Sequence, residues 1–130
     1  MPDMQKRLNQ SKLFIAVGIG GAIGAISRYS IAQFFADING FPFATLTVNL
    51  LGSFFLCLIL FQPKVIQRLK PWMFTGLTVG LIGSFTTFSA IILELYDLWH
   101  VNMGLAVIYL SITISGGLLC CFLRYKLAQS

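Results

Sequence analysis

Residues 83–89 read Gly83-Ser84-Phe85-Thr86-Thr87-Phe88-Ser89, and five of these seven residues are Gly, Ser or Thr. They lie within an apolar run that extends from Trp72 to Trp99. As one straight helix this run would measure about 42 Å, whereas the hydrocarbon core of a bilayer is about 30 Å thick. We therefore predict that the helix is interrupted near its middle. Non-helical backbone at membrane depth persists only where protein buries it or water reaches it, so the interruption is a candidate ion or substrate site.

The composition indicates an integral membrane protein. Of the 130 residues, 57% are hydrophobic and 10% are charged, and the mean hydropathy is +0.84. A soluble domain would carry about 25% charged residues. Four apolar runs are near or above the length of roughly 20 residues that a spanning helix needs. We predict an all-α protein in which residues 1–130 form a single four-helix transmembrane domain, with spans at about 13–35, 43–61, 72–99 and 101–123.

Groups that would carry covalent chemistry are lacking from the sequence pattern. No nucleophile–base pair, metal-ligand cluster or phosphate-binding loop is evident, so we do not expect an enzyme. Cys57, Cys120 and Cys121 all lie in apolar runs without metal-ligand spacing. Buried cysteine behaves as a small hydrophobe, and we predict that these three are inert.

Because four helices alone enclose little space, we also expect an oligomer.

The basic residues outside the spans predict the topology. With four spans, the N-terminus, the loop at 62–71 and the C-terminus share one side of the membrane. The opposite loops contain Asp37, Asp97 and His100 but no Lys or Arg. The positive-inside rule then places both termini in the cytoplasm, in a multi-pass protein of the cell membrane. The eight basic residues on that side are Lys6, Arg7, Lys12, Lys64, Arg68, Lys70, Arg124 and Lys126.

Two polar residues are unexpected within the first two runs. Arg28 lies about two-thirds of the way through the first run, where it either snorkels to the interface or raises the local anion concentration at a vestibule. Asn49 shares one helical face with Thr45, Gly52 and Ser53. This stripe suits close helix packing and a polar pathway equally well. In the first run, Gly20 and Gly24 are expected to let two backbones approach each other.

Two stripes compete for a pathway in the fourth run. Tyr109, Thr113 and Gly117 recur every four residues, and Ser111 and Ser115 form a second stripe about 160° away. Hydroxyls bonded back to their own helix would explain either stripe equally well. The sequence does not decide between them.

The acidic residues argue against a cation pathway. The four are Asp3, Asp37, Glu94 and Asp97, and we expect none of them at mid-span. A proton-coupled exporter of organic cations would need a carboxylate in its first span, and a cation pore often has a ring of carboxylates. One arginine, amides, hydroxyls and aromatic rings suit a small anion better.

Three motifs together resemble the CrcB/Fluc family of fluoride channels. They are Gly20-Gly21-x-x-Gly24-x-x-x-Arg28, Thr45-x-x-x-Asn49-x-x-Gly52-Ser53, and the stretch from Gly83 to Ser89 with Glu94 beyond it. The resemblance implies a passive fluoride-selective channel that exports cytoplasmic fluoride. It further implies a dimer of antiparallel subunits with two pores along the interface.

The resemblance also implies the site residues. Backbone carbonyls of Gly83 and Thr86 would hold a structural sodium ion at the dimer centre, and Arg28 would line a vestibule. Each pore would contain an amide, a phenyl ring and hydroxyls, because good donors must replace the water around fluoride and ring edges carry partial positive charge. These pore residues would be Asn49, Phe88, Ser89, Tyr109 and Thr113.

This chain departs from the family pattern at three positions. Ile91 stands where the family commonly has a second phenylalanine, Ala90 replaces a hydroxyl, and Gly117 stands where a serine is expected. An antiparallel homodimer also needs a sequence that inserts both ways, which the strong charge bias opposes. The alternative is therefore a poorly conducting or non-conducting subunit of a heterodimeric fluoride channel, formed with an oppositely oriented homologue. A small four-helix exporter is a further, weaker alternative.

Overall fold

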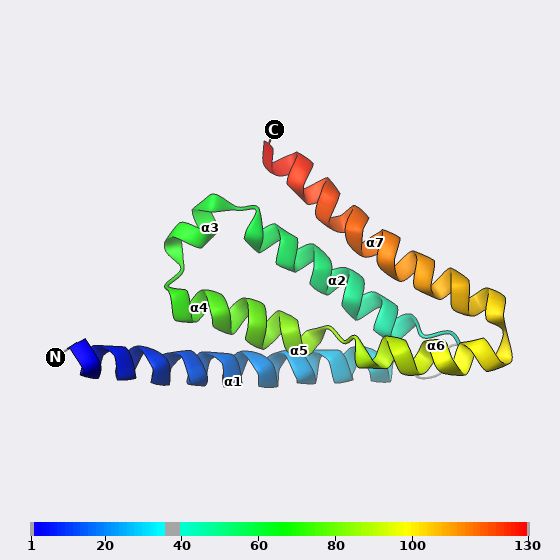
Figure 1. Cartoon of the computed structure of the whole chain (residues 1–130), viewed down its shortest axis with the longest axis horizontal. Helices are drawn as coiled ribbons and strands as arrows, with labels where there is room; N and C mark the ends of the chain where they lie inside the picture. The colour runs from blue at the N-terminus through cyan, green and yellow to red at the C-terminus, as the bar shows by residue number, and fades with distance from the viewer. Residues whose placement is uncertain (1, 36–39, 130) are drawn as a thin grey trace.

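The computed structural model describes residues 2–35 and 40–129, which form helices joined by short connections (Figure 1). Four helical segments are long and apolar enough to cross a membrane: Asn9–Phe34, Phe43–Leu60, Pro71–Val101 and Met103–Leu127. They correspond to the four predicted spans, with ends that differ by a few residues. The elements are α1 (Pro2–Phe34), α2 (Phe43–Leu60), α3 (Pro63–Arg68), α4 (Pro71–Thr75), the π-helical η1 (Gly76–Ile82), α5 (Gly83–Phe85), α6 (Ser89–Val101) and α7 (Met103–Gln129).

Local residue chemistry explains where several helices begin. Pro63 and Pro71 occupy the first positions of α3 and α4, where the missing N–H costs nothing and the fixed φ suits a helix. Asn102 has an extended backbone, and its Oδ1 accepts a hydrogen bond from the N–H of Leu105 at 3.2 Å. This cap separates α6 from α7. The N-terminal end of α1, α3 and the C-terminal end of α7 all lie away from the connection between α6 and α7 (Figure 1).

Glycines bring α1 into backbone contact with η1 and α5. A Cβ built on Gly20 would lie 2.9 Å from the backbone nitrogen of Leu81, and one built on Gly24 would lie 3.0 Å from that of Phe85 and collide with the carbonyl of Leu81. Gly80 on η1 meets α1 equally closely. The prediction that Gly20 and Gly24 permit a close approach is therefore confirmed.

The second contact pair is α2 with α7. Leu50 of α2 fits against Gly116 of α7, and Phe61 stacks edge-on against Tyr125 with ring centroids 5.2 Å apart. Cys57 and Cys121 form a disulfide across this contact, with Cα atoms 5.3 Å apart. The prediction of three inert cysteines is wrong for these two, because the pairing depends on residues 64 positions apart. Cys120 is free.

One subunit buries little of its apolar surface. Of the most apolar window in each span, between 11% and 33% is buried. The main cluster of buried residues joins Ile91 and Leu98 of α6 to Ala106 and Tyr109 of α7. Large side chains such as Phe14 and Val101 are at least three-quarters exposed. Surface of this kind suits lipid or a partner subunit.

Candidate functional site

The helical hydrogen bonding of the third span stops at residues 86–88. The last helical bond runs from the N–H of Thr86 to the carbonyl of Ile82 at 3.0 Å, after which Thr86 has an extended backbone with ψ 162°. The Thr86 hydroxyl donates to the same Ile82 carbonyl at 3.0 Å, and such back-bonding competes with helix propagation. This non-helical stretch is shorter than the expected 83–89, because residues 83–85 and Ser89 are helical.

Asn49 of α2 supplies hydrogen-bond partners to the non-helical stretch. Its Nδ2 donates to the Thr87 carbonyl at 2.9 Å, and its Oδ1 accepts from the Thr87 N–H at 2.9 Å. In an unbroken helix this N–H would bond the carbonyl of Gly83. The Asn49 amide therefore replaces the helical partners of both the N–H and the carbonyl of Thr87. A backbone that leaves the helix in an apolar environment needs such replacement hydrogen bonds.

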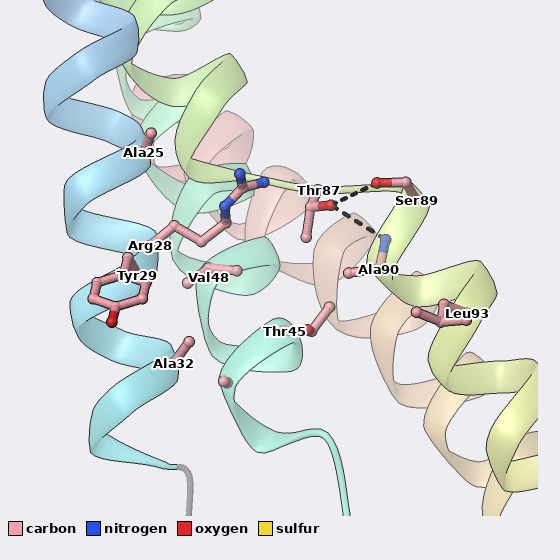
Figure 2. A pocket seen from close by; sticks show the side chains of 11 residues that line it. Ala25, Arg28, Tyr29, Ala32, Thr45, Val48, Thr87, Ser89, Ala90 and Leu93 are labelled. Atoms are coloured by element: carbon pink, nitrogen blue, oxygen red, sulfur yellow. Dashed lines mark hydrogen bonds between the residues drawn. The ribbon is translucent and has the colours of Figure 1, made fainter.

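Gly52 and Thr87 also determine how the non-helical stretch packs. A side chain at Gly52 would collide with the Thr86 methyl group, so α2 reaches Thr86 only because residue 52 is glycine. The Thr87 hydroxyl accepts from the N–H of Ala90 at 3.3 Å and lies 3.3 Å from the Ser89 hydroxyl (Figure 2). It thus satisfies one of the first N–H groups of α6.

Arg28 extends from α1 toward the non-helical stretch (Figure 2). Its Nη1 lies 3.5 Å from the Thr86 carbonyl, at the long limit of a hydrogen bond. It lines a pocket of about 680 Å³ together with Tyr29, Thr87 and Ser89. The Arg28 guanidinium is therefore directed at the non-helical stretch, within the lining of this pocket.

A second pocket, of about 340 Å³, lies against the same segment. Asn49, Gly83, Thr86, Phe88 and Thr113 all line it. Thr87 lines both this pocket and the pocket that contains Arg28. The two pockets therefore meet at the non-helical residues, and seven of the eight predicted site residues line one or the other.

Glu94 binds two hydroxyls from neighbouring helices. Thr45 of α2 donates to Oε1 at 2.6 Å, and Tyr109 of α7 donates to Oε2 at 2.7 Å. Tyr109 is fully buried. The carboxylate therefore links α2, α6 and α7, and its partner Thr45 lines the pocket that contains Arg28.

Comparison with known proteins assigns the chain to a family. Residues 15–125 match the model of the family described as "CrcB-like protein, Camphor Resistance (CrcB)". The chain is 37% identical over 120 residues to a Geobacillus kaustophilus protein named fluoride-specific ion channel FluC 2, covering 90% of this chain and 93% of that protein. It is 40% identical over 120 residues to fluoride-specific ion channel FluC 1 of Bacillus cereus, covering 90% and 83% respectively.

This chain belongs to the CrcB family. A third relative, fluoride-specific ion channel FluC 1 of Desulfitobacterium hafniense, is 41% identical over 108 residues, which are 82% of this chain and 94% of that protein. The resemblance inferred from the three motifs is confirmed. With four helices apolar enough to span a bilayer and relatives named as ion channels, this CrcB chain is a multi-pass membrane protein.

The fold of this CrcB chain sorts the predicted residues into an inner and an outer set. Asn49, Thr113 and Arg28 are partly buried, whereas Phe88 is 76% exposed and Ser89 is also exposed. Tyr109 lies outside both pockets, with its hydroxyl on Glu94. Thr113 bonds back to the Tyr109 carbonyl at 2.7 Å.

The two polar stripes on α7 also differ in burial. Ser111 and Ser115 are exposed on the outer face of the subunit, and the Ser115 hydroxyl bonds back to the Ser111 carbonyl. The stripe that includes Thr113 and Gly117 faces α2, where a Cβ at Gly117 would lie 3.5 Å from the Ser53 hydroxyl. Of the two stripes, the one that contains Thr113 lines the pocket beside Asn49.

Glu94 is the residue that sequence reasoning left out of the site. It lies within the third span, and a carboxylate in a span is by itself a reason to suspect function. This carboxylate can be recognised from the sequence. Its hydrogen-bond partners cannot be predicted from the sequence, because Thr45 and Tyr109 lie 49 and 15 positions away on other helices.

Proposed function

We propose that this chain forms a passive, fluoride-selective channel that lets cytoplasmic fluoride leave the cell. The observation that carries the proposal is the similarity over nine-tenths of the chain to proteins named fluoride-specific ion channels. The donors around residues 86–88 agree with it. No enzymatic step is needed, since a negative-inside potential drives an anion outward through an open pathway.

The polar groups around the non-helical stretch suit a small anion. Fluoride holds its water strongly, so a selective path must replace that water with N–H and O–H donors. Asn49 retains a second amide hydrogen beyond the one given to Thr87, and the Ser89 hydroxyl lines the larger pocket. The Thr113 hydroxyl lines the smaller pocket but donates its hydrogen to the Tyr109 carbonyl, so it would have to rotate to serve as a donor. Arg28 supplies positive charge at the larger pocket. Phe88 presents ring edges on the subunit surface.

An antiparallel dimer would complete these half-built pathways. Phe88 and Ser89 are exposed in one subunit, so a second subunit must cover them if they are to line a pore. The low burial of the apolar spans supports such a partner. With an oppositely oriented homologue as the partner, both termini of this chain would face the cytoplasm, as the basic residues favour; in a homodimer, one copy would have to insert the other way.

Backbone carbonyl oxygens would have to be the ligands of a structural sodium ion. Within residues 2–35 and 40–129, no group of three His, Cys, Asp or Glu could hold a metal. The Gly83 carbonyl has lost its helical partner to Asn49, and Gly83 is exposed. Carbonyl oxygens are suitable ligands for a hard cation. Arg28 lies beside the Thr86 carbonyl, so sodium binding there requires the guanidinium to move away.

The direct test is anion efflux from liposomes. The purified protein is reconstituted with potassium fluoride inside, valinomycin is added, and a fluoride electrode follows efflux while a chloride electrode follows chloride in parallel vesicles. We expect fluoride efflux without chloride efflux. Equal efflux of both ions would disprove selectivity.

A second candidate is a subunit of a heterodimeric channel. Ile91, where a ring is expected, is 8% exposed and lines the pocket that contains Asn49 and Thr113. The one-sided charge also favours a single orientation. This candidate predicts silent vesicles with this chain alone and fluoride efflux when an oppositely oriented homologue is added. Efflux of normal size from this polypeptide alone would reject it.

A further inference from the structure

We propose that this chain binds the headgroup of an anionic phospholipid in a pocket between the start of the first span and α4. The pocket has a volume of about 460 Å³ and is separate from the two pockets at residues 86–88. Lys12 of α1 and Lys70, directly before α4, contribute its two charges. The lining contains no carboxylate among the residues described.

The chemistry of the lining fits a phosphodiester. The two lysine ammonium groups are accompanied by amide donors from Asn9 and Gln10. A phosphodiester carries one negative charge and offers acceptor oxygens only. An acidic peptide or nucleic acid would need a wider basic surface, whereas two lysines in one pocket match a single headgroup.

The position of the pocket favours a lipid over free phosphate. Asn9 and Pro71 are the first residues of two membrane-spanning segments, so the pocket lies at the depth of the headgroups. Half-buried Trp72 also lines it, and tryptophan is enriched at this depth. Leu13, Pro71 and Trp72 provide apolar surface beside the lysines, which suits the glycerol and the upper acyl chain.

Native mass spectrometry of the intact protein in detergent tests this site. The protein is mixed with equal amounts of phosphatidylglycerol and phosphatidylcholine, and the retained lipid is counted. We expect selective retention of phosphatidylglycerol. The Lys12→Gln/Lys70→Gln variant should lower its affinity about tenfold or more, given the attraction of two lysines near an anionic headgroup.

The matched control removes the same charge elsewhere. Lys64→Gln/Lys126→Gln alters two exposed lysines expected on the same side of the membrane, neither of which lines the pocket. We expect it to retain phosphatidylglycerol as the unmodified chain does, and Lys12→Arg/Lys70→Arg to do the same. Equal losses in both Gln variants, or equal retention of the two lipids, would overturn the proposal. Circular dichroism checks that each variant is folded, and the single Lys12→Gln variant, expected to bind more weakly, replaces the double one if that fails.

A fluorescence experiment distinguishes binding of the lipid from binding of free phosphate. In a Trp99→Phe background, emission reports Trp72, because the chain has two tryptophans. Short-chain phosphatidylglycerol should shift this emission at concentrations where inorganic phosphate does not. An equal response to inorganic phosphate would identify a free-phosphate site and overturn the lipid assignment.

Discussion

Asn49 both links two helices and lines a pocket, so its position is compatible with each of the two roles predicted for it, helix packing and a polar pathway. Its amide bonds both backbone groups of Thr87, which makes it a structural link between α2 and the third span. It also lines a pocket with Thr113 and Phe88. A partly buried amide with both its oxygen and one hydrogen engaged cannot be exchanged without leaving a backbone group unpaired, a cost of about 1–3 kcal/mol.

Replacing Asn49 with aspartate tests this residue. Asn49→Asp keeps the acceptor for the Thr87 N–H but removes the donor to the Thr87 carbonyl and adds a negative charge to the pocket. We expect fluoride efflux from liposomes to fall by about tenfold or more, which corresponds to 1.4 kcal/mol. Asn102→Asp is the matched control, since Asn102 caps α7 through its oxygen and an aspartate preserves that bond. Similar losses in the two variants would contradict a specific role for Asn49.

At the level of elements, glycine determines how closely α1 can lie against η1 and α5. The backbone of α1 contacts backbone atoms of Leu81 and Phe85 across Gly20 and Gly24. Arg28 follows Gly24 by four residues and so lies one helical turn further along the same face. The close contact thereby places the guanidinium beside the Thr86 carbonyl. A wider separation of the two helices would remove Arg28 from the larger pocket.

Gly24→Ala should separate these helices. A Cβ there collides with the Leu81 carbonyl, and overpacking of this kind typically costs about 1–3 kcal/mol. We expect a lower midpoint of thermal unfolding in detergent and reduced fluoride efflux. Gly18→Ala is the control, because a Cβ at Gly18 meets nothing within 4 Å. An unchanged Gly24→Ala midpoint would show that α1 does not pack as the structure has it.

At the scale of the whole molecule, the distribution of charge favours one orientation in the membrane, whereas the exposed residues favour pairing with a second subunit. The basic residues favour one orientation in the membrane, while the proposed pore requires an oppositely oriented partner to cover Phe88 and Ser89, which are exposed in one subunit. A homodimer must satisfy both conditions with one sequence. A heterodimer divides them between two chains, which is why the charge bias and the Ile91 substitution support the same second candidate.

A reporter fusion tests the orientation of the whole chain. Alkaline phosphatase fused to the C-terminus is active only outside the cytoplasm, so we expect little activity if the basic residues hold the chain in one orientation. An antiparallel homodimer of this chain would instead place half of the fused enzyme outside and give high activity. Lys64→Gln/Arg68→Gln/Lys70→Gln removes the basic residues of the connection between α2 and α4 and should raise the activity, because the positive-inside bias weakens. Lys64→Arg/Arg68→Lys/Lys70→Arg preserves the charge and should match the unmodified fusion. High activity from the unmodified fusion would contradict cytoplasmic termini.

Local patterns alone determined the four spans, the close approach at Gly20 and Gly24, and the family. Each of these depends on hydropathy, residue size or short spacing within one segment, which a linear chain displays directly. Tertiary structure decided that Asn49 bonds Thr87, that Glu94 binds Thr45 and Tyr109, and that Cys57 joins Cys121. These partners belong to different helices, and only the packing angles and the register between helices bring their side chains within bonding distance.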